Sequence, residues 1–171
     1  QDIDGEAGLD KSGWSVSLSA NGLTVAIGAP YNDGYSLRSG HVRVYQYADG
    51  AWIKMGPDIN GKRSFDMFGS SVSLSADGRT VAIGAPGIDR DVVDRGQVLI
   101  YEYSESGGYW RPIGASAYGE AARDNVGESV SLSADGRMLA IGAPGNDGNG
   151  KDSGCVRIYQ YVYNKYGSAG T

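Results

Sequence analysis

The sequence predicts an all-β fold: a β-propeller built from four-stranded antiparallel blades, in three repeats of about 57 residues. Three observations lead to this prediction. One residue pattern occurs three times along the chain, short polar/apolar alternations are joined by Asp-Gly or Asn-Gly, and no segment has a helical period. Alternating runs joined by such turns are typical of antiparallel hairpins. A long repeat indicates units that bury their apolar faces only by stacking on their neighbours.

The repeats divide the whole chain into three units. They begin at Gly13, Gly69 and Gly127, which are 56 and 58 residues apart. A Gly-Ala-Pro segment keeps the same spacing in all three. We therefore expect one blade in each of the ranges 1–56, 57–114 and 115–171.

The second repeat shows the expected elements in order. Residues 71–75 alternate polar and apolar side chains, as a half-buried strand does, and Asp77-Gly78 then predicts a tight hairpin turn. Residues 80–85 form a mostly buried second strand whose small Ala and Gly residues let another backbone approach closely. After a polar loop, residues 97–103 are rich in Val, Ile and Tyr and predict a third strand, and residues 109–113 a short fourth one.

Composition excludes several classes of function. The net charge is −5 and no Lys/Arg cluster is present, which argues against a nucleic-acid partner. No apolar run approaches the roughly 20 residues that a membrane-spanning helix needs. Cys155 is the only cysteine, so an intrachain disulfide is excluded. It occupies the position of His41 and Gln97 in the other repeats, where we expect a half-buried strand residue.

Specific motifs point to a known family. Phe68-Gly69 and Gly84-Ala85-Pro86 resemble the FG-GAP repeat, and Gly-Ala-Pro recurs at 28–30 and 142–144. FG-GAP repeats build the propeller of integrin alpha subunits and propellers of many extracellular and bacterial surface proteins. The resemblance therefore implies an extracellular or cell-surface location and a role in adhesion, recognition or matrix assembly.

One departure from the family concerns calcium. Calcium-binding FG-GAP repeats carry an Asp-rich loop just before Gly-Ala-Pro, whose oxygens surround the ion. Here the corresponding stretch, 73–78, reads Ser-Leu-Ser-Ala-Asp-Gly, so Leu and Ala replace part of the loop. We expect a hairpin without calcium there, no defined metal site and no cofactor; only the loops around Asp33, Asp89 and Asp147 could hold a cation weakly.

Candidate ligand-binding residues lie in the polar loops after Gly-Ala-Pro, which differ most among the repeats and which a propeller presents on one face. Asn and Asp in such loops either cap exposed backbone or bind a ligand or a weakly held cation. Trp52 and Trp110 occupy matching positions on outer strands, where an aromatic ring packs or stacks on a sugar. The candidates are Tyr31, Asn32, Asp33, Asp89, Asp91, Asn146, Asp147, Trp52 and Trp110.

A second set of equivalent acids precedes each repeat. Asp10, Asp66 and Asp124 each lie three residues before the repeat-starting Gly. We expect them to hydrogen-bond a turn between adjacent blades.

The sequence favours a non-enzymatic module with a protein or glycan ligand on the loop face. His41 is the only histidine, and no nucleophile motif accompanies it. One alternative is a carbohydrate-binding lectin with one site per repeat; a less favoured one is a hydrolase or lyase on a propeller scaffold. Three blades alone would expose two apolar faces. We therefore expect a homo-oligomer, as a six-bladed dimer, or a place in a longer array of repeats.

Overall fold

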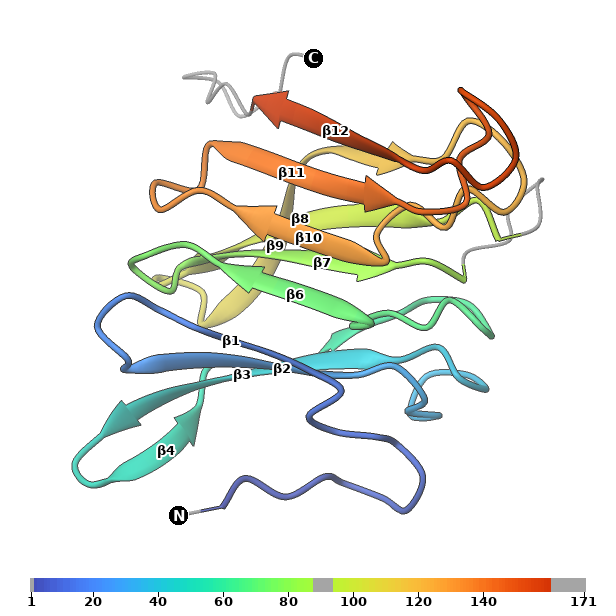
Figure 1. Cartoon of the computed structure of the whole chain (residues 1–171). Helices are drawn as coiled ribbons and strands as arrows, with labels where there is room; N and C mark the ends of the chain where they lie inside the picture. Colours follow the sequence, from blue (N-terminus) through green and yellow to red (C-terminus); the bar gives the residue numbers. More distant parts are fainter. Residues whose placement is uncertain (1, 88–93, 161–171) are drawn as a thin grey trace.

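The computed structural model describes residues 2–87 and 94–160 and consists of antiparallel sheets stacked side by side (Figure 1). No helix occurs among these residues, which confirms the all-β prediction. The first sheet has the order β1-β2-β3-β4, and β5 pairs with β3 beyond this path. Its strands are β1 (Ser15–Leu18), β2 (Thr24–Ala29), β3 (His41–Ala48), β4 (Ala51–Lys54) and β5 (Ile59–Asn60).

The second and third sheets repeat this arrangement. The second has the order β6-β7-β8-β9 and the third β10-β11-β12. The sequence has no clear counterpart of the fourth strand in the third repeat, and residues 161–171 lie outside the described residues. The strands are β6 (Ser71–Leu74), β7 (Thr80–Ala85), β8 (Gln97–Ser104), β9 (Tyr109–Tyr118), β10 (Ser129–Leu132), β11 (Met138–Ala143) and β12 (Cys155–Gln160).

The hairpin turn between the first two strands of each sheet forms where the sequence predicts it. Gly78 has a φ of 70°, a left-handed conformation that glycine adopts without a steric penalty. Asp77 Oδ1 accepts hydrogen bonds from Ser75 Oγ and from the Arg79 N–H. In the third sheet the Ser133 hydroxyl makes the same bond and is the main reason why the pKa of Asp135 is lowered.

The fourth strand of the second sheet is longer than predicted. β9 runs on across residue 114 to Tyr118, because its pairing with β8 resumes at Gln97 and Val98 after a register shift. The same stretch of the first repeat is split into β4 and β5. Pro57 lies between those two strands and has no N–H to donate to a ladder.

The hydrophobic core lies between the sheets. Along β7 alternate side chains point to opposite neighbours: Val81 and Ile83 join the cluster with the first sheet, and Ala82 joins the cluster with the third. Glycine allows the close approach that the sequence predicted, since a Cβ at Gly84 would lie 2.0 Å from the carbonyl oxygen of Gly127.

Candidate functional site

The first and third loops that follow Gly-Ala-Pro leave the same edge of the sheets, opposite the hairpin turns (Figure 1). In the first loop Asp33 Oδ1 accepts a 2.6 Å hydrogen bond from the Arg38 N–H, and in the third Asp147 Oδ1 accepts a 2.7 Å bond from the Asp152 N–H. Both carboxylates thus cap loop backbone, and both side chains are exposed. Asp89 and Asp91 of the second loop lie outside the described residues.

Asn32 and Asn146 attach these loops to the body of the protein. The side-chain oxygen of Asn32 accepts from the Gly34 N–H, while its amide nitrogen donates to Asp10 Oδ2 at 2.7 Å. Asn146 makes the matching bonds with the Gly148 N–H and with Asp124. The sequence predicted these residues individually but not their pairing.

The second acidic set is buried and stabilises turns. Asp10 Oδ2 also accepts from the Ala7 N–H, and Asp66 Oδ2 accepts from the Arg63 N–H. Asp124 Oδ2 accepts from two successive N–H groups, those of residues 120 and 121. Buried carboxylates are tolerated where hydrogen bonds replace their hydration. These hydrogen bonds cap the turns before each repeat, as predicted.

Tyr31, one of the predicted candidates, lies in an aromatic cluster whose other members were not predicted. Its ring meets that of Trp14 edge-on at 5.8 Å, and the Arg38 guanidinium lies over it at 5.5 Å. Arg38 also lies 6.0 Å from the ring centre of Phe65, from the turn before the second sheet. Trp14 is 59% exposed and Phe65 is also exposed. No sequence signal marked these residues, because Ser70 and Glu128 replace Trp14 in the other repeats.

The two candidate tryptophans lie away from the loops. Trp52 packs edge-on against Tyr47 with ring centres 5.3 Å apart, at the β3–β4 hairpin, on the opposite edge of the molecule from the loops (Figure 1). Trp110 is buried against Tyr103, and its indole N–H donates a 2.7 Å hydrogen bond to the Met55 carbonyl. Burial leaves little of the Trp110 ring accessible for stacking.

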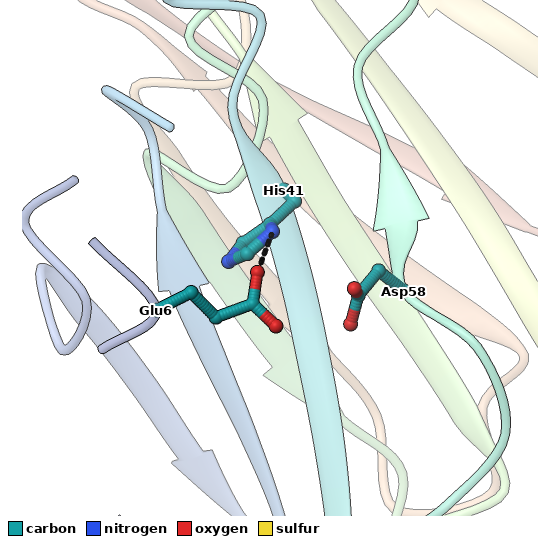
Figure 2. Close-up of side chains that lie close together, drawn as sticks. All are labelled: Glu6, His41 and Asp58. Atoms are coloured by element: carbon teal, nitrogen blue, oxygen red, sulfur yellow. Dashed lines mark ion pairs between the residues drawn. The ribbon is translucent and has the colours of Figure 1, made fainter. Parts of the chain in front are cut away.

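A cluster of three metal-ligating side chains forms beside β3 (Figure 2). Glu6 comes from the N-terminal segment, His41 from the start of β3 and Asp58 from just before β5, and one ligand atom of each lies within 4.8 Å of the others. His41 is 2% exposed, whereas Cys155 at the equivalent position of the third repeat is half-buried, as predicted. Burial lowers the pKa of His41, outweighing the nearby carboxylates, so the imidazole is neutral at pH 7.

Neutral imidazole with two carboxylates could hold a divalent ion. However, both carboxylates of the cluster already form ion pairs with cationic side chains. Arg43 Nη1 lies 3.7 Å from Glu6 Oε1, and Lys54 Nζ lies 2.6 Å from Asp58 Oδ1. The charges are thus balanced within the cluster, which ties the N-terminal segment and the stretch before β5 to β3.

The equivalent position of the second repeat is a cavity of about 270 Å³. Gln97 takes the place of His41 and donates a 2.8 Å hydrogen bond to the Tyr118 hydroxyl. Lys62 and Arg63 contribute positive charge to the lining. The cavity is lined by Asn60, Gly61, Lys62, Arg63, Asp66, Phe68, Gln97, Leu99, Tyr101, Ser116 and Tyr118.

Solved structures with the same fold are β-propeller-like. The chain superimposes on the periplasmic gluconolactonase PpgL of Pseudomonas aeruginosa with a TM-score of 0.57 and 17% identity, covering 86% of this chain and 39% of that one. A candidate 6-phosphogluconolactonase of Bacteroides uniformis gives 0.54 and 14%, covering 89% and 36%. Sqt1 of Saccharomyces cerevisiae gives 0.55 and 16%, covering 95% and 35%. The chain thus spans between 35% and 39% of their lengths.

These similarities correct one prediction. The expectation that the chain is not an enzyme is contradicted, since its propeller relatives include a gluconolactonase. That expectation rested on the single histidine and on the absence of nucleophile and phosphate-binding motifs. Abundant Asp residues leave acid–base chemistry by paired carboxylates open on this fold. At 14–17% identity the likeness itself extends to the fold alone.

Sequence comparison identifies the family. No curated protein sequence matches the chain significantly. Within the described residues, no helix is long and apolar enough to cross a membrane. The model of the FG-GAP repeat matches residues 60–101 and 115–159, which together make up half of the chain. This protein belongs to the FG-GAP repeat family.

Proposed function

We propose that this chain is a recognition module of an extracellular or cell-surface protein, and that it binds a protein or glycan ligand through the loop face of its β-propeller blades. The supporting observation is the cluster of half-buried Tyr31 with the exposed side chains of Trp14, Arg38 and Phe65. It joins the first Gly-Ala-Pro loop to the turn that precedes the second sheet. FG-GAP repeats are typical of extracellular proteins, which supports the location.

The chemistry of the cluster suits recognition. Aromatic faces bury large areas at a low cost in conformational entropy, and they stack on sugar rings or on apolar side chains of a partner. Arg38 adds a charged donor for carboxylate or hydroxyl groups. Backbone bonds from Phe65 to Leu37 and from Met67 to Arg38 hold the two segments together before any ligand arrives.

A glycan array and a panel of extracellular-matrix proteins test the proposal with matched variants. Trp14→Ala and Phe65→Ala remove exposed rings from the loop face and should abolish binding of whichever ligand is captured. Trp52→Ala removes a ring from the opposite edge and should leave binding unchanged. Loss of binding only in Trp52→Ala would contradict the loop face as the site, and so would the absence of any ligand in both panels.

The lectin alternative is the narrower form of the same proposal. It requires that glycans alone are bound. Binding that survives in the presence of excess free sugars would exclude it and leave a protein ligand.

A second candidate function is hydrolysis of a sugar lactone, which the likeness to a gluconolactonase favours. His41, the only histidine of the chain, lies 3.9 Å from Glu6 and would be the proton acceptor for attack of water on a lactone carbonyl, provided that its buried ring opens to substrate. Turnover of gluconolactone above the spontaneous rate would support this function if His41→Gln abolished it. Rates equal to the buffer blank would exclude gluconolactone as a substrate.

A further inference from the structure

The joints between neighbouring sheets repeat the same hydrogen bonds. Ser17 Oγ accepts from the Leu74 N–H at 3.0 Å across the first joint, and Ser73 Oγ accepts from the Leu132 N–H at 2.9 Å across the second. The counterpart in the third sheet, Ser131, is exposed on the outer face. This face thus carries the acceptor that the next Leu N–H of the series would need.

A second set of hydrogen bonds between neighbouring sheets joins their hairpin turns. The Ala20 N–H donates to the Ala76 carbonyl at 3.0 Å, and the Ala76 N–H donates to the Ala134 carbonyl at 2.8 Å. The series has a direction: each turn donates to the following sheet and accepts from the preceding one. The outward groups at its ends are therefore complementary, since the Ala134 N–H is a donor and the Ala20 carbonyl is an acceptor.

The apolar side chains of the two outer faces are complementary in the same way. Val16 and Leu18 of the first sheet are 63% and 61% exposed, whereas their counterparts in the second, Val72 and Leu74, are 9% and 7% exposed. At the other end of the stack Val156 and Ile158 are 69% and 61% exposed. Their counterparts in the first sheet, Val42 and Val44, are 0% and 2% exposed and cover the second sheet.

Gly142 lacks the contact with a neighbouring sheet that the equivalent glycines of the other two sheets make. A Cβ at Gly28 or Gly84 would collide with the Gly69 or Gly127 carbonyl oxygen of the next sheet, at 2.1 and 2.0 Å. At Gly142 a Cβ would meet only Ser129 atoms of its own sheet. The third sheet therefore keeps the space into which the Gly13 carbonyl of a further first sheet fits.

The N-terminal segment supplies a matching strand. Ile59 and Asn60 pair with Val42 and His41, and Ala117 and Tyr118 pair with Val98 and Gln97. In each case the stretch that leads into one sheet pairs with the third strand of the sheet before it. By the same register, Ile3 and Asp4 would pair with Val156 and Cys155 of a preceding third sheet.

We infer that a second copy of this chain docks its first sheet on the outer face of the third sheet, with Ile3–Asp4 adding to β12, and that two copies close a six-bladed ring. The two faces lie at opposite ends of the stack, so one copy cannot join its own ends (Figure 1). Propellers close with roughly four to eight blades. Two copies with three sheets each supply six blades, which falls in that range, and two joints then leave no outer face exposed. This inference is independent of the ligand.

Mass in solution tests the arrangement. Sedimentation equilibrium at micromolar concentration should give twice the 17.9 kDa mass of one chain. Leu18→Asp and Val156→Asp each place a carboxylate in both joints and should give folded monomers, as judged by far-UV circular dichroism. Ile53→Asp changes an equally exposed side chain of β4 away from the joints and should remain a dimer.

Mixing the two monomeric variants tests the direction of the joint. The third sheet of Leu18→Asp and the first sheet of Val156→Asp are both intact, so an equimolar mixture should regain one joint and form a heterodimer. The inference is overturned if the unaltered chain is a monomer, if its mass rises steadily with concentration, or if either variant stays a dimer. A mixture that stays monomeric overturns it as well.

A disulfide tests the strand register. Residues directly opposite in an antiparallel pair lie about 4.5–5.5 Å apart between Cα atoms, within the range that a disulfide spans. Asp4→Cys should therefore form a covalent dimer with native Cys155 of the second copy on mild oxidation. The double variant Asp4→Cys/Cys155→Ser should not. Equal yields of covalent dimer from the two variants, or none from either, would overturn the register.

Discussion

The side-chain amide of Asn32 donates a 2.7 Å hydrogen bond to Oδ2 of Asp10, a buried carboxylate 22 residues earlier in the chain. The pair recurs as Asn146 and Asp124 in the third repeat. A polar loop that faces solvent is thus fixed to a buried acid of the scaffold. This attachment orders the loop without packing it in a core, so its other side chains remain accessible.

Removal of this attachment should cost stability. Asn32→Ala takes a donor from a buried carboxylate, and such a loss typically costs about 1–3 kcal/mol. We expect a reduction of that size in the free energy of unfolding measured in urea. Tyr35→Ala, in the same loop but exposed, is the control and should change it by less than about 0.5 kcal/mol. Equal effects of the two substitutions would show that the Asn32 bond is unimportant.

His41 should make stability depend on pH. Burial lowers its pKa in the folded state below the ordinary value near 6.5, so the unfolded chain binds the proton more readily. Stability should therefore fall as the pH drops from about 6.5 toward the folded-state pKa. His41→Gln, which copies Gln97 of the second repeat, should remove this component. Unfolding free energies of both proteins between pH 7.5 and 5 provide the measurement, and parallel profiles would contradict the prediction.

Gly84 should not tolerate a side chain. A methyl group there would lie 2.0 Å from the Gly127 carbonyl oxygen, so the second and third sheets would have to separate. Overpacking of this kind typically costs about 1–3 kcal/mol, and we expect Gly84→Ala to lower the melting temperature accordingly. Gly8→Ala places its methyl group in open space and is the control. A melting temperature unchanged by Gly84→Ala would mean that the joint adapts.

Calcium should not stabilise the protein through the hairpin turns. Asp77 Oδ1 already accepts two hydrogen bonds, and the neighbouring positions of the family's calcium loop are Leu74 and Ala76. Because an ion that binds only the folded state raises the melting temperature, millimolar calcium should leave that temperature unchanged. A rise of several degrees that disappears in Asp77→Asn would contradict this prediction.

Elements set by local chemistry could be predicted from the sequence. The alternation of residues 71–74 and the Asp77-Gly78 turn fix a hairpin between neighbours in the chain, and the hairpin forms as expected. The extension of β9 to Tyr118 could not be predicted. It depends on pairing with Gln97 and Val98 beyond a register shift, which no local pattern reveals.

The sequence likewise identified residues of the candidate site but not the contacts between them. Repetition identified Asn32 and Asn146 as loop residues, but their bonds to Asp10 and Asp124 join segments that only folding brings together. The sequence left open whether Trp110 packs or stacks on a sugar, because its cover comes from Tyr103 and from the Met55 carbonyl of the preceding repeat.

The sequence by itself determined the family, the all-β class of the fold and the hairpin that opens each repeat, since these depend on side-chain alternation and turn chemistry within a few residues. The tertiary structure decided which polar and aromatic residues meet: the cluster around Tyr31, the neutral His41 between two acids, and the complementary outer faces. Those properties depend on distances and burial between separate sheets, and the free energy of burying a group depends on all its neighbours in space.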